Sequence, residues 1–167
     1  MKKNQRNGLY VRNIVFGVED SLVSTVGLLS GIASAGVSHK VILLTGFVYI
    51  LIEGFSMAIG SYLSEESALE YEKGPRATTM EPILAAGVML LSFTLAGFVP
   101  IIPYLLLSGT AALAWSVGIS LAVLGFVGYV QARYSGVKTF LRVLRIVTLG
   151  GIAIAIGLTV GSLLGIE

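Results

Sequence analysis

The sequence predicts an all-α, polytopic membrane protein with five transmembrane helices. The composition is 55% hydrophobic and only 12% charged, and the mean hydropathy of +0.90 lies well outside the range of soluble domains. Five apolar runs are each long enough to cross the hydrocarbon core of a bilayer. The basic residues gather on one side of these runs. We therefore expect residues 1–167 to form a single transmembrane domain.

The five apolar runs define the expected helices in chain order. They are residues 13–36, 41–64, 82–107, 109–131 and 146–166. The first run follows a short basic segment and leads directly into further spans, so we expect a retained helix and not a cleaved signal. The third run ends at Pro100 and Pro103, and because each proline removes a backbone donor, we expect a break there. Residues 65–81 are too few to bury a core of their own and are expected to form a short cytoplasmic linker.

Glycines recur at four-residue spacing in the first and fifth spans. They are Gly27, Gly31, Gly157, Gly161 and Gly165. Small residues at this spacing let helix backbones approach closely in lipid. Spacing alone leaves open whether the contact lies within one subunit or between two. The position of the first glycine face beside acidic residues favours a subunit interface, and we expect a homodimer.

The orientation is predicted from the basic residues of the short loops. Lys40 alone falls at one face of the membrane, and the other ten fall at the opposite face. These ten are Lys2, Lys3, Arg6, Arg12, Lys73, Arg76, Arg133, Lys138, Arg142 and Arg145. The N-terminus and the linkers 65–81 and 132–145 are therefore expected in the cytoplasm, with the C-terminus outside. The net charge of +2 records this asymmetry and gives no indication of nucleic-acid binding.

Acidic residues occur within the first two spans, where an unpartnered carboxylate is costly and usually marks an ion or proton path. Asp20, preceded by Glu19, lies seven residues into the first span, roughly 10 Å from the cytoplasmic face. Met57 lies seven residues from the end of the second span, at a similar depth. Glu53 is one turn deeper on the same face as Met57. The sequence thus predicts a ladder of Asp20, Met57 and Glu53 toward the middle of the membrane.

The residue types in this ladder favour a transition metal as cargo. Carboxylate oxygens bind hard and borderline divalent cations, whereas a thioether is a soft ligand that magnesium and calcium do not prefer. The mixture indicates Fe²⁺ or Mn²⁺. Because metal binding requires deprotonated ligands, we expect exchange coupled to protons. The chain has no cysteine, which excludes disulfides and thiolate metal sites. No nucleophile and base pair stands out, so we expect no enzyme, no catalytic residue and no resident cofactor.

Each of these residues also has a structural interpretation. Asp20 could cap a shorter first helix over residues 21–37, which is near the lower limit for crossing a membrane. Glu53 could be held by hydroxyl groups, since Thr45 and Tyr49 lie nearby on its own helix. Met57 alone is more often core filler than ligand. The acidic residues that follow the second span are expected on a solvated helical extension and could attract cations. They are Glu65, Glu66, Glu70 and Glu72.

Two motifs carry a resemblance to a known family. Residues 17–25 read G-V-E-D-S-L-V-S-T, which resembles the first-helix motif G-x-N-D-G-L-V-S-T of the vacuolar iron transporter family. This family includes the yeast calcium-cross-complementer type and the plant nodulin-21-like proteins. Residues 56–64 read S-M-A-I-G-S-Y-L-S and resemble the second-helix motif S-M-A-x-G-E-Y-x-S. The proline pair and the five-span layout match along nearly the whole chain, so the chain is identified as a member.

The resemblance implies a homodimeric exchanger that moves Fe²⁺, and often Mn²⁺, out of the cytosol against protons. It further implies that the aspartate of the first motif and the methionine of the second line the path at the dimer interface. These positions are Asp20 and Met57 in this sequence. Glu53 does not belong to either motif, and its candidacy rests on its depth and helix face.

The sequence departs from the family pattern at three points. Glu19 and Ser21 replace the usual asparagine and glycine, which adds an acid at the cytoplasmic mouth. Ser61 replaces the usual glutamate, which removes one. The linker 65–81 stands where well-studied members carry a longer cytoplasmic domain, rich in glutamate and methionine, that gathers metal. This chain lacks that domain, which brings efficient metal capture into question and leaves the membrane path intact.

Two functions of different class follow. The first is a minimal divalent-metal/proton antiporter, with Asp20 and Met57 as path ligands, Glu53 as a deeper ligand or proton acceptor and Glu19 as an entrance charge. The second is a non-transporting membrane scaffold, metal sensor or partner subunit. The expected partners are a divalent metal ion, protons, membrane lipid and a second copy of the chain. The absence of a targeting segment and the small size favour a prokaryotic plasma membrane over a vacuole.

Overall fold

The computed structural model describes residues 3–74 and 80–165, and within these ranges the chain forms five α-helices and no strand. The helices are α1 (Lys3–Ser34), α2 (His39–Lys73), α3 (Glu81–Leu106), α4 (Gly109–Ser135) and α5 (Thr139–Leu164). Each contains a stretch long and apolar enough to cross a membrane. The predicted all-α, multi-pass architecture is therefore confirmed.

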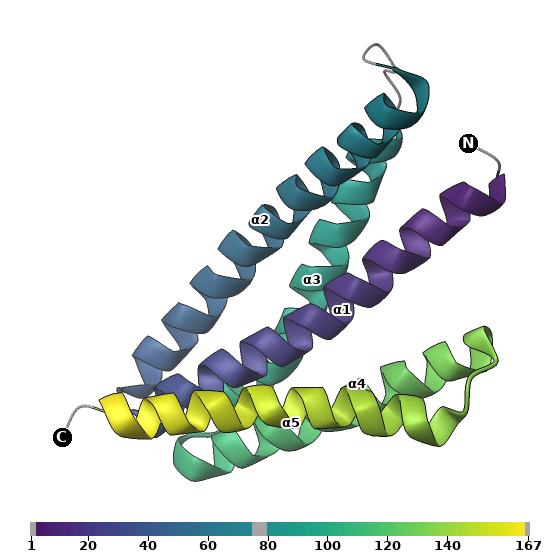
Figure 1. The fold of residues 1–167 in the computed structure, drawn as a ribbon. Helices are drawn as coiled ribbons and strands as arrows, with labels where there is room; N and C mark the ends of the chain where they lie inside the picture. Colours follow the sequence, from purple (N-terminus) through teal and green to yellow (C-terminus); the bar gives the residue numbers. More distant parts are fainter. Residues whose placement is uncertain (1–2, 75–79, 166–167) are drawn as a thin grey trace.

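The first helix is the centre of the bundle. α1 packs against all four other helices, while α2 packs mainly on α3, and α4 packs mainly on α5 (Figure 1). α5 runs parallel to α1, because Gly27, Gly31 and Ala35 meet successively later residues of α5. The first and last described residues therefore lie at opposite ends of the bundle, as an odd number of crossings requires. Which end faces the cytoplasm stays a prediction.

Glycine builds the close contact between α1 and α5. A Cβ atom added to Gly157 would overlap the carbonyl oxygen of Gly27, and one added to Gly161 would overlap the carbonyl oxygen of Gly31. A Cβ atom on Gly31 would lie 2.9 Å from the Gly157 oxygen. These small residues pack two helices of a single chain. The interpretation of the α1 glycine face as a subunit interface is therefore wrong, since α5 of the same chain already occupies it.

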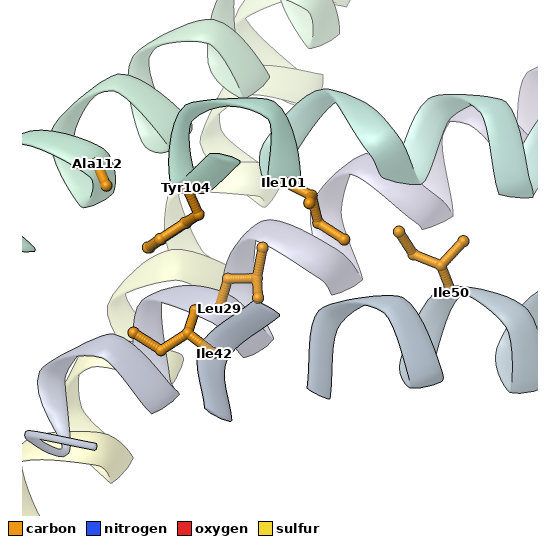
Figure 2. Close-up of a cluster of buried hydrophobic side chains, with 6 residues drawn as sticks. All are labelled: Leu29, Ile42, Ile50, Ile101, Tyr104 and Ala112. Carbon is orange, nitrogen blue, oxygen red and sulfur yellow. The ribbon is translucent and has the colours of Figure 1, made fainter. Parts of the chain in front are cut away.

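A hydrophobic cluster fills the end of the bundle where α1 ends and α2 begins (Figure 2). Its buried members come from α1, α2, α3 and α4, and they are Leu29, Ile42, Ile50, Ile101, Tyr104 and Ala112. Lipid tails are as apolar as these side chains, so close packing, and not exclusion of water, holds the cluster together. The outer faces of α2 and α5 expose further large apolar side chains, including Phe55 and Ile156, as expected for helices that face lipid.

The predicted break at the two prolines is wrong, because α3 continues through Pro100 and Pro103 to Leu106. Membrane helices tolerate proline where neighbouring helices and local hydrogen bonds supply other partners. The carbonyls that Pro100 and Pro103 leave without a helical donor are those of Ala96 and Val99. The Ser116 hydroxyl of α4 donates a hydrogen bond to the Pro100 carbonyl at 2.7 Å and ties this part of α3 to α4. The Leu107 amide donates to the Pro103 carbonyl at 2.8 Å and closes the last turn.

The helices extend beyond the predicted spans. α2 has 35 residues, which amount to about 52 Å at 1.5 Å per residue, against a hydrocarbon core of about 30 Å. Residues 65–73 of the predicted linker are therefore helical, whereas residues 75–79 lie outside the described part of the chain. α5 likewise begins at Thr139, within the predicted linker 132–145. Hydropathy detects the part of a helix that lies in lipid and not its continuation into water.

The helical extension of α2 is only partly solvated. Glu70 and Glu72 are exposed as expected, and the Tyr62 hydroxyl donates a hydrogen bond to Glu66 at 2.9 Å. Glu65 is buried instead, and its carboxylate lies 3.4 Å from the guanidinium of Arg12. Because the Arg12 side chain is 67% exposed, this ion pair contributes little net stability. It does tie the start of α1 to the end of α2.

Candidate functional site

Asp20 lies in the interior of α1, seventeen residues after the first described residue of that helix. The alternative in which Asp20 caps a shorter helix is therefore wrong. Its side chain is half-buried, and the Ser24 hydroxyl one turn later donates a hydrogen bond to the Asp20 main-chain carbonyl at 2.6 Å. That bond gives the Ser24 hydroxyl an acceptor within α1.

Asp20 of α1 and Glu53 of α2 lie near one another. Their carboxylates lie close enough to repel one another. The Tyr49 hydroxyl, one turn from Glu53 on the same face of α2, lies beside Ser24 and close enough to both carboxylates to feel their charge. The structure thus brings together two acids, a phenol and a serine hydroxyl between two membrane helices. This grouping includes one of the hydroxyl partners, Tyr49, that the structural alternative for Glu53 requires.

The register of α1 and α2 places Met57 next to this acid pair. The helices are antiparallel, and the Ser61 hydroxyl donates a hydrogen bond to the Asn13 side-chain carbonyl at 2.8 Å. Each step forward along α1 corresponds to a step back along α2, so Asp20 lies level with Gly54. Glu53 and Met57 lie on either side of that level. The sequence placed Met57 level with Asp20 and Glu53 one turn deeper, whereas this register places Glu53 one residue and Met57 three residues from the level of Asp20.

Met57 borders an open hollow of about 690 Å³ between α1, α2 and α3. The lining residues are Arg12, Asn13, Phe16, Ser56, Met57, Gly60, Ser61, Ser64 and Met89. Neither Asp20 nor Glu53 lines the hollow, which combines a second thioether with amide and hydroxyl groups. Sequence reasoning missed Asn13 and Met89. The polar Asn13 at the start of an apolar run was the available signal, whereas nothing marked Met89 apart from its residue type.

Glu19 points to a different part of the molecule. Its carboxylate accepts a hydrogen bond from the Gln131 amide of α4 at 2.7 Å. The Gln131 side-chain oxygen in turn accepts a hydrogen bond from Nε of Arg142 on α5 at 3.0 Å. Consecutive helix residues are about 100° apart around the axis, so Asp20 faces α2 while Glu19 faces α4. The structure does not bring Glu19 together with Asp20, Glu53 and Met57.

One chain alone supplies few metal ligands. Among residues 3–74 and 80–165, no three His, Asp or Glu side chains gather closely enough to hold a metal ion. The acid pair provides two carboxylates, and Met57 and the nearby hydroxyls could add weaker ligands. A transition metal at this site would therefore complete its coordination with water or with groups from another chain.

Five membrane helices with an acid pair between the first two define a multi-pass membrane protein with a candidate ion path. Comparison with known proteins identifies the group to which it belongs. The model of the VIT family matches residues 11–81 and 67–162. The chain belongs to the VIT family, and the resemblance drawn from its two motifs is confirmed.

Relatives from plants are similar along most of this chain. Vacuolar iron transporter homolog 4 of Arabidopsis thaliana is 32% identical over 174 residues, which cover 92% of this chain and 85% of the relative. Vacuolar iron transporter homolog 3 of the same plant is 31% identical over 149 residues, which cover 81% of this chain and 74% of the relative. Vacuolar iron transporter 2 of Oryza sativa subsp. japonica is 23% identical over 214 residues, which cover 92% of this chain and 87% of the relative. That last alignment exceeds the 167 residues of this chain, so the relative carries insertions.

Proposed function

We propose that this protein exports a divalent transition metal, Fe²⁺ or Mn²⁺ or both, from the cytosol in exchange for protons. Family membership supports transport of a metal ion across a membrane, and the names of the relatives specify iron. The observation that carries the proposal for this chain is the Asp20 and Glu53 pair beside Met57, between two helices that cross the membrane.

The chemistry of the pair accounts for the proposed coupling. A carboxylate binds a metal ion only after it has lost its proton, so metal and protons compete for Asp20 and Glu53. Metal that arrives from the hollow beside Met57 would displace protons from the pair, and protons that arrive from the other side would displace the metal. Met57 adds a soft ligand, which favours Fe²⁺ or Mn²⁺ over magnesium and calcium.

We further propose that two copies of the chain complete the site. One chain offers two strong oxygen ligands, whereas a metal ion of this type takes four to six ligands in all. A twofold axis beside the α1 and α2 contact would place a second Asp20 and Glu53 pair opposite the first. In this homodimer the hollow beside Met57 would open toward the partner. The basic residues would orient its N-terminal end to the cytoplasm.

Transport in liposomes tests the proposal. Purified protein is reconstituted, the lumen is made acidic, and entry of Fe²⁺ and of Mn²⁺ is followed for the native chain and for Asp20→Asn. We expect uptake that depends on the proton gradient in the native chain and no uptake above empty liposomes in the variant. The asparagine keeps the shape of the side chain but loses the charge that binds the metal.

Glu70→Gln is the matched control, because it also removes one carboxylate from the chain but at an exposed position beyond the predicted span. It is expected to transport like the native protein. Unchanged uptake by Asp20→Asn would contradict the assignment of the path. Absence of uptake in every sample, from protein shown to be folded, would favour the scaffold, sensor or partner-subunit alternative.

A further inference from the structure

A second groove, lined by α1, α4 and α5, opens at the end of the bundle where α4 ends and α5 begins. It has a volume of about 560 Å³. Val11, Ile14 and Val15 of α1 and Val130 of α4 supply apolar walls. An apolar hollow within a membrane-spanning bundle suits a hydrocarbon chain, because lipid fills any such hollow that the protein leaves open.

The mouth of this groove is basic. Arg12, Arg142, Tyr134 and Ser135 line it, and within the described part of the chain the one acid paired with these residues is Glu65 of α2, which lies 3.4 Å from the Arg12 guanidinium outside the groove. Arg142 has a defined position, because its Nε donates to the Gln131 side-chain oxygen, and Gln131 is itself held by Glu19. The guanidinium of Arg142 above apolar walls is complementary to a ligand with an anionic head and an apolar tail, and Arg12 adds a charge that it shares with Glu65.

We propose that this groove binds one anionic phospholipid, with its phosphate at Arg142 and Arg12 and an acyl chain along the valines of α1 and α4. Basic pockets between membrane helices on the cytoplasmic side are suited to anionic headgroups, which are concentrated in that leaflet. A soluble phosphate would leave the apolar walls without a partner. Glu19 faces this side of α1 and Asp20 faces the other, so the groove and the acid pair lie on different faces of α1, while Arg12 borders both the groove and the hollow beside Met57.

Native mass spectrometry of the purified protein tests the proposal. The protein in mild detergent is offered equal amounts of phosphatidylglycerol and phosphatidylcholine, and retained lipid is counted for the native chain, Arg142→Gln and Arg145→Gln. Arg145 lies on the same helix but is exposed and outside the groove, which makes it the matched control. We expect the native chain and Arg145→Gln to retain phosphatidylglycerol preferentially. Arg142→Gln should lower that retention about fivefold, the amount expected for one interfacial cation.

Val15→Phe provides a second variant that leaves all charges in place and fills the groove from its half-buried wall. Val15→Phe should reduce retained phosphatidylglycerol as Arg142→Gln does. If Arg142→Gln fails to fold, Val15→Phe alone tests whether the groove binds the lipid. The proposal is overturned if the native chain retains both lipids equally, or if Arg145→Gln loses as much as Arg142→Gln. Displacement of the lipid by inorganic phosphate alone would also overturn it, because the site would then bind a soluble anion.

Discussion

Adjacent acids of α1 have different surroundings. Asp20 meets Glu53 and Tyr49 of α2, whereas Glu19 is held by Gln131 of α4. The sequence motif predicted both as groups of the metal path, because adjacency in sequence does not show which neighbour each side chain meets. Helix periodicity alone could separate their directions by about 100°, but only the packing of α4 shows where Glu19 points.

Met57 is expected to influence the choice of metal more than the stability of the protein. Met57→Leu keeps the volume of the side chain and removes the sulfur, a change that usually costs less than about 1.5 kcal/mol of stability. Fe²⁺ binds N and S ligands more strongly than Mn²⁺ does in the general affinity order, so the apparent affinity for Fe²⁺ should fall severalfold and that for Mn²⁺ less. Concentration series of the liposome uptake measure both affinities.

Met80→Leu is the control for that substitution, since Met80 is exposed at the N-terminal end of α3 and does not border the hollow. It should leave both affinities unchanged. An equal loss for the two metals in Met57→Leu would show that the sulfur does not select between them. No loss for either metal would assign Met57 to packing.

The helices themselves follow well from the sequence, and their contacts do not. Hydropathy locates all five spans. The predicted second span ends before α2 ends at Lys73, and the predicted fifth span begins after α5 begins at Thr139, because the additional turns carry charged residues. The two prolines predicted a break that is absent, since a helix packed among other membrane helices tolerates the loss of two backbone donors. Glycine spacing predicted a close contact and could not name its partner, which is α5 of the same chain.

The α1 and α5 contact is expected to depend on one glycine in particular. Gly157→Ala places a methyl group on the Gly27 carbonyl and should lower stability by about 1–3 kcal/mol, the usual effect of overpacking. Gly151→Ala on the same helix adds a methyl group with no atom within 4 Å and should be neutral or slightly stabilising. Apparent Tm values of the two variants in detergent give the comparison, and equal values would contradict the close contact.

At the scale of the whole molecule, the α1 and α2 side is the expected meeting surface of two copies. Phe16 lies there at the rim of the hollow and is half exposed. The chain has no cysteine, so a single introduced thiol gives an unambiguous cross-link. Phe16→Cys should form a disulfide-linked dimer on mild oxidation in membranes, visible as a doubled mass that reducing agent reverses.

Phe126→Cys is the matched control, because Phe126 is an exposed phenylalanine on α4, away from the hollow. It should remain monomeric on the same gel. Cross-linking of Phe126→Cys without cross-linking of Phe16→Cys would move the subunit contact to the opposite side of the bundle. The ligands that a second chain supplies would then have to be sought elsewhere.

The glycine contact between α1 and α5 also has a mechanical consequence. The two helices touch near the C-terminal end of α1 and diverge toward its N-terminal end (Figure 1). The contact would therefore act as a pivot near the C-terminal end of α1 if that helix tilted. Gly31 and Arg12 are separated by roughly 28 Å at 1.5 Å per residue, so a tilt of about 5° would swing the far end of α1 by about 2.5 Å. Such a tilt would change the spacing between Asp20 and Glu53 while the glycine contact stays closed, and it would have to break the contacts of Arg12 and Asn13 with α2 or carry α2 along.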